Sequence, residues 1–250
     1  MLDTALWLLP VALAAGFVDA VAGGGGLITI PALLWAGLGP VEALATNKAQ
    51  AVFGSATATI HFIRRGAIAL RETLPAVLLT FLGAAAGAVL VQHIDAAALE
   101  HAIPLLLIGF ALYFWFSPRV SDIDSHQRIG HGAFALTIGL GVGFYDGVFG
   151  PGTGTFFAIA YVSLLGYNLR RATAHTKLLN FTSNLAALLL FVSGGHVLWE
   201  IALVMAGGQL VGAWIGAHLV LRHGAALVRP ILVVVSIAIS ARLLWEQLLG

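Results

Sequence analysis

Two lysines are the residues of this sequence whose chemistry most needs an explanation. Lys48 and Lys177 are its only lysines, and each stands in a long apolar segment. An ammonium group near the centre of a membrane span costs roughly 2.5–3.5 kcal/mol on insertion scales, so it needs a partner or contact with water. A small anion bound by the lysines is one such partner. The carboxylates of Asp19 and Asp146, which also lie in apolar stretches, are the other.

Polar side chains accompany both lysines at helical spacing and could complete an anion site with hydrogen bonds. Backbone N–H groups of nearby glycines are further candidate donors. The predicted substrate-binding residues are Lys48, Lys177, Asn47, Thr46, Thr176, His175, Asn180, Gly24, Gly25 and Gly152. Asp19 and Asp146 are predicted coupling or structural residues, acting as proton sites, as partners of the lysines or as caps of broken helices.

Each lysine follows a glycine-rich stretch, the four glycines Gly23–Gly26 in one case and GPGTG from Gly150 in the other. Four glycines in a row cost a helix about 1 kcal/mol each relative to alanine, which predicts unwound backbone. At membrane depth, such backbone is tolerated only where protein or a water-filled cavity satisfies its polar groups. A second role of glycine is close helix packing. It suits the glycines with small-xxx-small spacing, which are Gly83, Gly87, Gly212 and Gly216.

The lysine and glycine motifs belong to an internal repeat. At an offset of 127 residues, GFVDAVAG around Asp19 matches GFYDGVFG around Asp146. At an offset of 129, the triplet TNK that ends at Lys48 matches the triplet HTK that ends at Lys177. Matching aspartate, lysine and glycine positions exceed what an apolar composition supplies. We therefore predict two transmembrane repeats, residues 1–125 and 126–250.

The composition is that of a membrane protein. Hydrophobic residues make up 60% of the chain and charged residues 9%, against roughly 25% charged in soluble domains. The continuous apolar runs predict an all-α, polytopic integral membrane protein with about eight long and two short segments. The absence of cysteine excludes disulfides and thiolate chemistry, and the net charge of +1 gives no electrostatic case for nucleic acid. No metal-ligand spacing occurs, so we expect neither a metal nor a cofactor.

The apolar segments set the predicted topology. The long segments are residues 5–21, 41–63, 74–91, 96–116, 133–149, 169–192, 197–221 and 225–248, and the short ones are residues 27–38 and 155–165. Basic residues at 64–71, in the linker after residue 116 and at 222–229 place these loops in the cytoplasm. If the short segments dip and return, the repeats are parallel. If each carries the chain across, the repeats are inverted and both termini lie outside. The loop charges favour the inverted arrangement, although twelve helical residues reach only about 18 Å.

The motifs GFVDAVAGGGGLITIPALL with ATNKAQ, and GFYDGVFGPGTGTFF with ATAHTKLLN, resemble those of the sulfite exporter TauE/SafE family of membrane transporters. The resemblance covers nearly the whole chain. It implies a multi-pass transporter of the inner (cytoplasmic) membrane, whose characterised relatives export sulfite or organosulfonates. The second-half motif resembles a widespread branch with no settled substrate, so the ligand stays open.

Inverted repeats with broken helices are a recurrent plan of secondary transporters, with the site near the midplane where the halves meet. We therefore expect a non-enzymatic transporter whose partners are a small anionic substrate, the lipid bilayer and protons as the coupling ion. An anion channel built on the same residues is the alternative. An intramembrane enzyme using Asp19 or Asp146 is disfavoured, because no HExxH or GxSxG motif accompanies them.

Overall fold

The computed structural model describes residues 2–116 and 126–223, and the regular structure of these residues is helical. The first half contains α1 (Leu2–Ala22), α2 (Gly26–Trp35), α3 (Pro40–Arg64), α4 (Leu70–Val91) and α5 (Ala96–Phe116). The second contains α6 (His131–Phe134), the π-helical turn η1 (Ala135–Gly139), α7 (Leu140–Val148), α8 (Thr153–Leu165), α9 (Leu169–Ser193) and α10 (Trp199–His223). The predicted segment 225–248 and most of the central linker lie outside the described residues.

The helices have the length and composition of a polytopic membrane protein, as predicted. Among the described residues, those long and apolar enough to cross a bilayer are Leu70–Val91, Leu169–Ser193 and Trp199–Leu219. On α4, Leu74, Leu78 and Leu82 recur every four residues and are all more than half exposed. A stripe of exposed leucines along one helix face is what contact with lipid requires.

Both predicted helix breaks are present. The first helix ends at Ala22 and the next begins at Gly26, and Gly23 between them has a φ of +78°. In the second half the break lies between Val148 and Thr153, where Gly150 has a φ of +99°. Because L-residues with a side chain rarely adopt positive φ, glycine at these two positions allows the chain to leave the helix abruptly.

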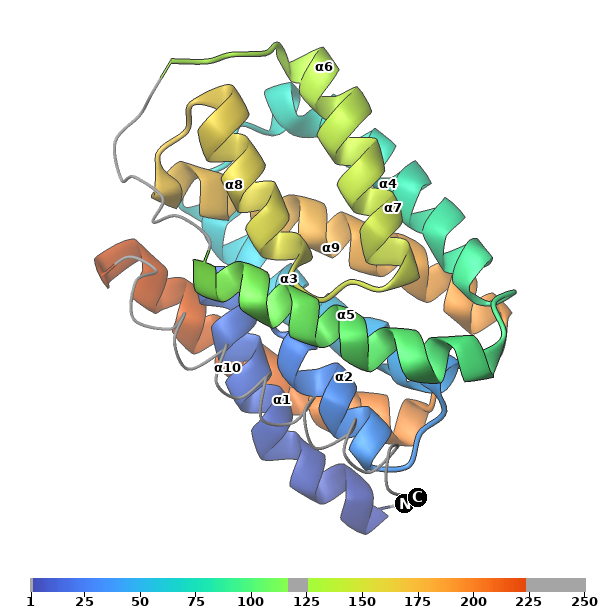
Figure 1. Cartoon of the computed structure of the whole chain (residues 1–250). Coiled ribbons are helices and arrows are strands. Elements are labelled where there is room, and N and C mark those ends of the chain that lie inside the picture. The colour runs from blue at the N-terminus through green and yellow to red at the C-terminus, as the bar shows by residue number, and fades with distance from the viewer. Residues whose placement is uncertain (1, 117–125, 224–250) are drawn as a thin grey trace.

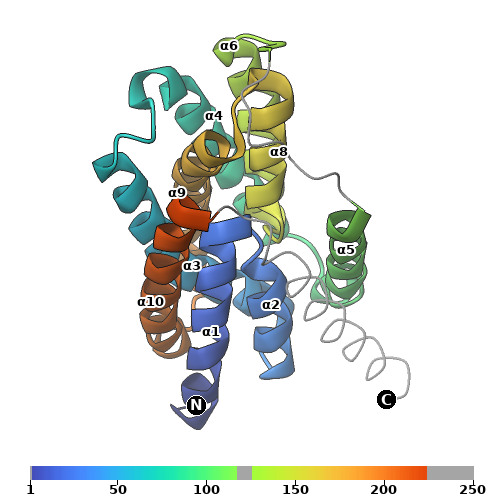
Figure 2. The same ribbon diagram turned by 90° about the vertical axis from the view of Figure 1, so that its left-hand side faces the viewer.

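Each short helix folds back along the helix before it. The ring centroids of Trp7, near the start of α1, and Trp35, at the end of α2, lie 5.2 Å apart, so the two helices are antiparallel. In the second half, Phe134 and Tyr161 are in a similar relationship, with centroids 4.6 Å apart. Figure 1 shows the hairpin α1–α2 opening toward the end of the molecule that holds the N-terminus, and α7–α8 opening toward the opposite end. Figure 2 shows the same arrangement from the side.

The hairpins show that α2 and α8 fold back along the helices before them, and the expectation that they carry the chain across the membrane stays a prediction. A pattern of apolar residues gives the length of a segment, but not the direction in which it leaves a glycine turn. Within the described residues, the first half contributes one hairpin and three long helices, and the second half contributes one hairpin and two. Three crossings per half, an odd number, would still invert the second half relative to the first. The cytoplasmic side of each basic loop stays a prediction.

Close glycine contacts join the two halves. A Cβ atom on Gly83 would lie 2.2 Å from the Leu140 carbonyl oxygen, and one on Gly212 would lie 2.0 Å from that of Leu13. The predicted packing role of these glycines is therefore confirmed. The contacts place α4 against α7 and α10 against α1, so a helix of each half packs on the first helix of the other.

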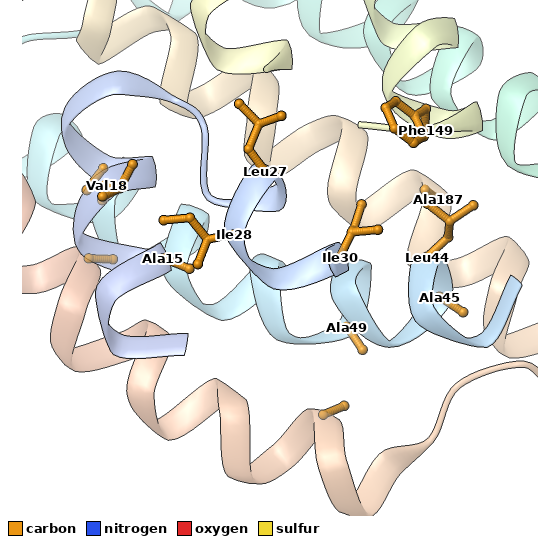
Figure 3. Close-up of a cluster of buried hydrophobic side chains, with 14 of the residues drawn as sticks. Ala15, Val18, Leu27, Ile28, Ile30, Leu44, Ala45, Ala49, Phe149 and Ala187 are labelled. Atoms are coloured by element: carbon orange, nitrogen blue, oxygen red, sulfur yellow. The ribbon is translucent and has the colours of Figure 1, made fainter. Parts of the chain in front are cut away.

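Apolar packing holds the hairpin tips in place. Figure 3 shows Leu27 and Ile30 of α2 in the same cluster as Leu44 of α3 and Phe149, which lies in the second break. All four side chains are buried. Burial of these residues fixes both breaks against the central helices, and with them the polar groups described next.

Candidate functional site

The two helix breaks meet backbone to backbone. A Cβ atom on Gly23 would lie 2.5 Å from the Gly154 Cα, and one on Gly154 would lie 2.4 Å from the Gly23 Cα. Distances this short leave no room for a side chain at either position. The unwound backbone of each half therefore faces that of the other in the interior of the protein.

Lys48 forms an ion pair beside this contact. Its Nζ lies 2.8 Å from Oδ1 of Asp146, and the exposed fractions of the two side chains are 1% and 4%. Lys48 lies on α3 and Asp146 near the end of α7, so the pair joins the two halves of the chain. The lysine does not reach toward the membrane surface, which excludes the interfacial placement common for lysines in apolar helices.

Lys177 forms the corresponding pair with the roles of the halves exchanged. Its Nζ lies 3.4 Å from Oδ2 of Asp19 and also donates to the backbone carbonyl oxygen of Asp19. The lysine is as buried as Lys48, whereas the side chain of Asp19 is 24% exposed. The predicted alternative of lysine–aspartate pairing is therefore present, and each pair connects the two halves.

The first break donates a backbone hydrogen bond to a carboxylate. The N–H of Gly25 lies 3.4 Å from Oδ1 of Asp19. Gly24 and Gly25 in the first break, and Gly152 in the second, precede the first turns of α2 and α8, and their carbonyl oxygens accept the first helical hydrogen bonds. N–H groups ahead of the first turn of a helix favour negative charge. In this structure, Asp19 supplies that charge.

Several buried polar atoms near the lysines lack a hydrogen-bond partner within the described part of the chain. They are Oδ2 of Asp146, Oγ1 of Thr176, Oδ1 of Asn180 and Oε1 of Gln50. The amide nitrogen of Asn180 lies beside Gly154, only 2.8 Å from where a Cβ of that glycine would be. Since most buried polar atoms in proteins are hydrogen-bonded, these atoms are candidate partners for water or for a polar ligand.

Asn47 is tied into a polar chain that leads to the first hairpin. Its Oδ1 accepts hydrogen bonds from Oγ1 of Thr29 at 2.5 Å and from Nε2 of Gln50 at 2.9 Å. Gln50 is one of the polar side chains that accompany the lysines at helical spacing, whereas Thr29 was not predicted, and its polar character inside an apolar helix was the signal that could have identified it. The arrangement fixes the side chain of Asn47 one residue before Lys48.

Thr46 and His175 have different partners. Oγ1 of Thr46 accepts a hydrogen bond from the N–H of Leu198 at 3.2 Å, just before α10. Nε2 of His175 accepts one from the N–H of Ala69 at 3.1 Å, just before α4. Both side chains thus anchor the start of a helix from the other half. Their positions two residues before a lysine put them on a different face of the helix.

A partly exposed polar cluster lies apart from the lysine pairs, at the starts of α4, α6 and α9. Oε2 of Glu72 lies 3.6 Å from Nη2 of Arg171 and 3.7 Å from Nε2 of His131. Cζ of Arg171 lies 3.8 Å from the centre of the Tyr167 ring. Burial raises the pKa of the Tyr167 hydroxyl, and the nearby Arg171 opposes that shift. Exposed ion pairs of this kind contribute little to stability. A substitution of Glu72 is therefore a suitable control for substitutions in the two buried ion pairs.

Comparison with known proteins agrees with the resemblance of the motifs. The family model described as "Sulfite exporter TauE/SafE" matches residues 8–243. The chain is 50% identical over 237 residues to the "Probable membrane transporter protein YfcA" of Escherichia coli (strain K12), covering 95% of this chain and 88% of the relative. It is 45% identical over 246 residues to a "Probable membrane transporter protein" of Haemophilus influenzae, covering 98% and 96%. No solved structure matches the chain.

Proposed function

Because this chain belongs to the sulfite exporter TauE/SafE family of membrane transporters, we propose that it is a secondary transporter that exports a small anion such as sulfite or an organosulfonate. The proposed binding site lies between the two helix breaks, where Lys48 and Lys177 supply the positive charge. We further propose that the protein resides in the cytoplasmic membrane with its basic loops inside, as the loop charges favour.

One observation carries this proposal: both lysines of the chain are buried where the breaks meet, each held by a carboxylate from the other half. A carboxylate and a sulfur oxyanion accept hydrogen bonds from the same donors, namely an ammonium group, a hydroxyl and backbone N–H groups. Asp19 accepts from Lys177 and from the N–H of Gly25. The aspartates are therefore internal ligands of the kind that an incoming anion could replace.

The unpartnered polar atoms support the same site. The hydroxyl of Thr176 and the side-chain amide of Asn180 are buried on α9, next to Lys177 in sequence and beside the contact of the breaks. The hydroxyl of Thr176, the side-chain amide nitrogens of Asn180 and Asn47 and the glycine N–H groups are the neutral donors that this proposal gives an oxyanion, whereas the unpartnered Oδ1 of Asn180 is an acceptor. Thr46 and His175 take a supporting role in this proposal, because their acceptor atoms bind loop N–H groups.

Replacement of a carboxylate by an anion has a consequence for protons. A carboxylate that loses its lysine inside the protein would carry an uncompensated charge, which is costly at membrane depth. Taking up a proton removes that charge. We therefore propose that protons are the coupling ion and that the aspartates are their binding sites.

The direct test is transport by the purified protein in lipid vesicles, with sulfite and methanesulfonate as probes. The proposal expects one of the probes to accumulate against its gradient when a pH gradient is imposed, and expects Lys48→Gln and Lys177→Gln to abolish the accumulation. Glu72→Gln, which alters an exposed ion pair, is the control and should transport normally. Flux that only dissipates a gradient would make the protein a channel. No flux and no binding of any sulfur oxyanion or carboxylate would contradict the anion site.

A further inference from the structure

We infer that the two lysine–aspartate pairs have different roles: Asp19 is the carboxylate that takes up a proton when an anion binds Lys177, whereas Asp146 is held in its pair. This inference rests on the proposed function, and it deepens that function by assigning the proton to one of two related carboxylates. It follows from differences between the pairs in access, in geometry and in the backbone around them.

The first difference between the two pairs is the exposure of the aspartate side chain. The side chain of Asp19 is 24% exposed and that of Asp146 is 4% exposed, although both lysines are at 1%. A proton reaches a carboxylate through water, so an exposed carboxylate can exchange a proton while its lysine stays shielded. The more exposed aspartate also has the longer ion pair. The distance from the lysine Nζ to the nearest carboxylate oxygen is 3.4 Å for Asp19 and 2.8 Å for Asp146.

A hydroxyl group holds Asp146, and no described residue provides its counterpart at Asp19. Oγ1 of Thr153 lies 2.8 Å from Oδ1 of Asp146 and 2.7 Å from the carbonyl oxygen of Gly150, linking the carboxylate to the backbone of the break. At the offset of 127 residues that aligns the two aspartates, the residue matching Thr153 is Gly26. Asp19 instead accepts from the N–H of Gly25 at 3.4 Å, a longer contact.

The second break is also tied more firmly than the first. The hydroxyl of Tyr145 donates to the carbonyl oxygen of Pro151, which closes the loop between α7 and α8. The residues at the matching positions of the first half are Val18 and Gly24, which offer neither a hydroxyl nor a proline ring. Since glycine is the most conformationally free residue and proline the least, the first break can move more readily than the second.

Within residues 2–116 and 126–223, the charged groups that the observed contacts place around Asp19 are those of the two pairs. Lys177 faces it from α9, and Lys48 with Asp146 lies across the contact of the breaks. The adjoining α2 has no titratable side chain, and α10 places Gln209 and Gly212 along α1. The protonation state of Asp19 therefore depends on whether Lys177 is paired with it or with an anion.

The proton balance is simple. When a monovalent anion binds the ammonium of Lys177, the carboxylate of Asp19 leaves it and takes one proton from water. The occupied site then holds one ammonium, one anion and one neutral carboxyl group, and its net charge equals that of the empty site. Anion affinity should fall as pH rises, because an ionised Asp19 competes for Lys177.

Carbodiimide labelling tests the assignment without any ligand. A water-soluble carbodiimide reacts with a carboxyl group that it can reach whenever that group is transiently protonated, so the rate reports how readily each aspartate leaves its lysine and takes up a proton, and mass spectrometry locates the adduct. We expect wild-type protein to label at Asp19 roughly tenfold faster than at Asp146, the scale of one hydrogen bond to a charged group. Thr153→Val, which removes the hydroxyl and keeps the side-chain size, should raise labelling of Asp146 and leave Asp19 unchanged. Equal labelling in the wild type, or no response to Thr153→Val, would overturn the assignment.

Thr57→Val is the matched control, because the Thr57 hydroxyl donates to the Phe53 carbonyl oxygen of its own helix and, in the part of the chain that the structure describes, to no carboxylate. It should leave both labelling rates at wild-type values. Gel filtration of each variant separates a specific effect from unfolding, since an unfolded protein would label at both aspartates and elute early.

Anion binding gives the second measurement. Methanesulfonate stays ionised over the whole pH range of the protein, so any proton taken up on binding belongs to the protein. Titration calorimetry in buffers of different ionisation enthalpy should show about one proton per anion in the wild type. Asp19→Asn should bind without proton uptake and with an affinity independent of pH, whereas Asp146→Asn should keep the proton uptake. Loss of uptake in Asp146→Asn alone would reverse the assignment. If neither methanesulfonate nor sulfite binds any variant, the proposed function fails, while the labelling result still decides which carboxylate is open.

Discussion

Lys48 on α3 and Asp146 on α7 form a buried ion pair whose members come from different halves of the chain, and Lys177 and Asp19 repeat this relationship with the halves exchanged. Neither half can neutralise its own lysine in this arrangement. Any movement of one half relative to the other therefore acts on both pairs at once. This links binding at the lysines to the relative position of the two helix breaks.

Glycine-to-alanine substitutions test which glycines pack closely against a neighbouring helix. A Cβ atom at Gly83 would lie 2.2 Å from the Leu140 carbonyl oxygen, whereas one at Gly141, on the helix that faces it, meets nothing within 4 Å. We expect Gly83→Ala to force α4 and α7 apart and to lower the free energy of unfolding by about 1–3 kcal/mol. Gly141→Ala should be neutral or stabilising by up to about 1 kcal/mol, because alanine favours the helix. Thermal unfolding of both variants is the measurement, and equal effects would show that the helices do not meet as described.

Cysteine labelling tests the inverted arrangement. The chain has no native cysteine, so single cysteines at Ala67, between α3 and α4, and at Ser193, at the end of α9, provide a clean background. With one hairpin and three crossings in each half, these two positions lie on opposite sides of the membrane. We expect an impermeant thiol reagent to label Ser193→Cys from outside intact cells and Ala67→Cys only after permeabilisation. Labelling of both from one side would favour parallel repeats.

Helix positions and helix breaks could be predicted from the sequence to a large extent. The predicted segment 41–63 became α3 (Pro40–Arg64), and the glycine run predicted the end of α1, because length, hydropathy and backbone freedom are local properties. The return of α2 along α1 could not be predicted in this way. It depends on contacts such as that between Trp7 and Trp35, which are 28 residues apart in the sequence and are brought together only by the tertiary fold.

The lysine–aspartate pairs could be predicted only in part from the sequence, for a related reason, and the anion-binding role of the residues around them stays a prediction. The two lysines and two aspartates were identified as the charged groups of the interior, and pairing between them was one of two readings. Which lysine meets which aspartate depends on the contact of the breaks, a tertiary feature. Thr46 and His175 illustrate the opposite case, because a spacing of two residues from a lysine already places a side chain on another face of the helix.

Substitutions of Thr46 test whether this residue supports the start of α10 or belongs to the anion-binding site. The N–H of Leu198 would lose its partner in Thr46→Val, at a cost of about 1–3 kcal/mol if the group stays buried. Thr46→Ser should keep the hydrogen bond and most of the stability. Anion affinity should change little in either variant, because the side chain bonds to a loop. A tenfold or larger loss of affinity in a folded Thr46→Val would return Thr46 to the binding site.

The central claim is that the two paired lysines supply the positive charge for the transported anion and that Asp19 occupies Lys177 in its absence. Removing one lysine leaves its aspartate stranded, which for a buried pair costs about 3–5 kcal/mol of stability. Glu72→Gln, in an exposed pair, should change stability by no more than about 1 kcal/mol. The informative variants are the double substitutions Lys48→Gln with Asp146→Asn and Lys177→Gln with Asp19→Asn, which remove both charges of a pair.

The measurement is thermal stability together with sulfite and methanesulfonate affinity for the single and double variants. Lys48→Gln and Lys177→Gln should each be less stable than the wild type. Each should also bind the anion roughly ten- to over a hundredfold more weakly, because a hydrogen bond to a charged group contributes about 1.5–3 kcal/mol. The double variants should regain stability but not affinity. Double variants that regain both would show that the pairs are structural and that the anion binds elsewhere.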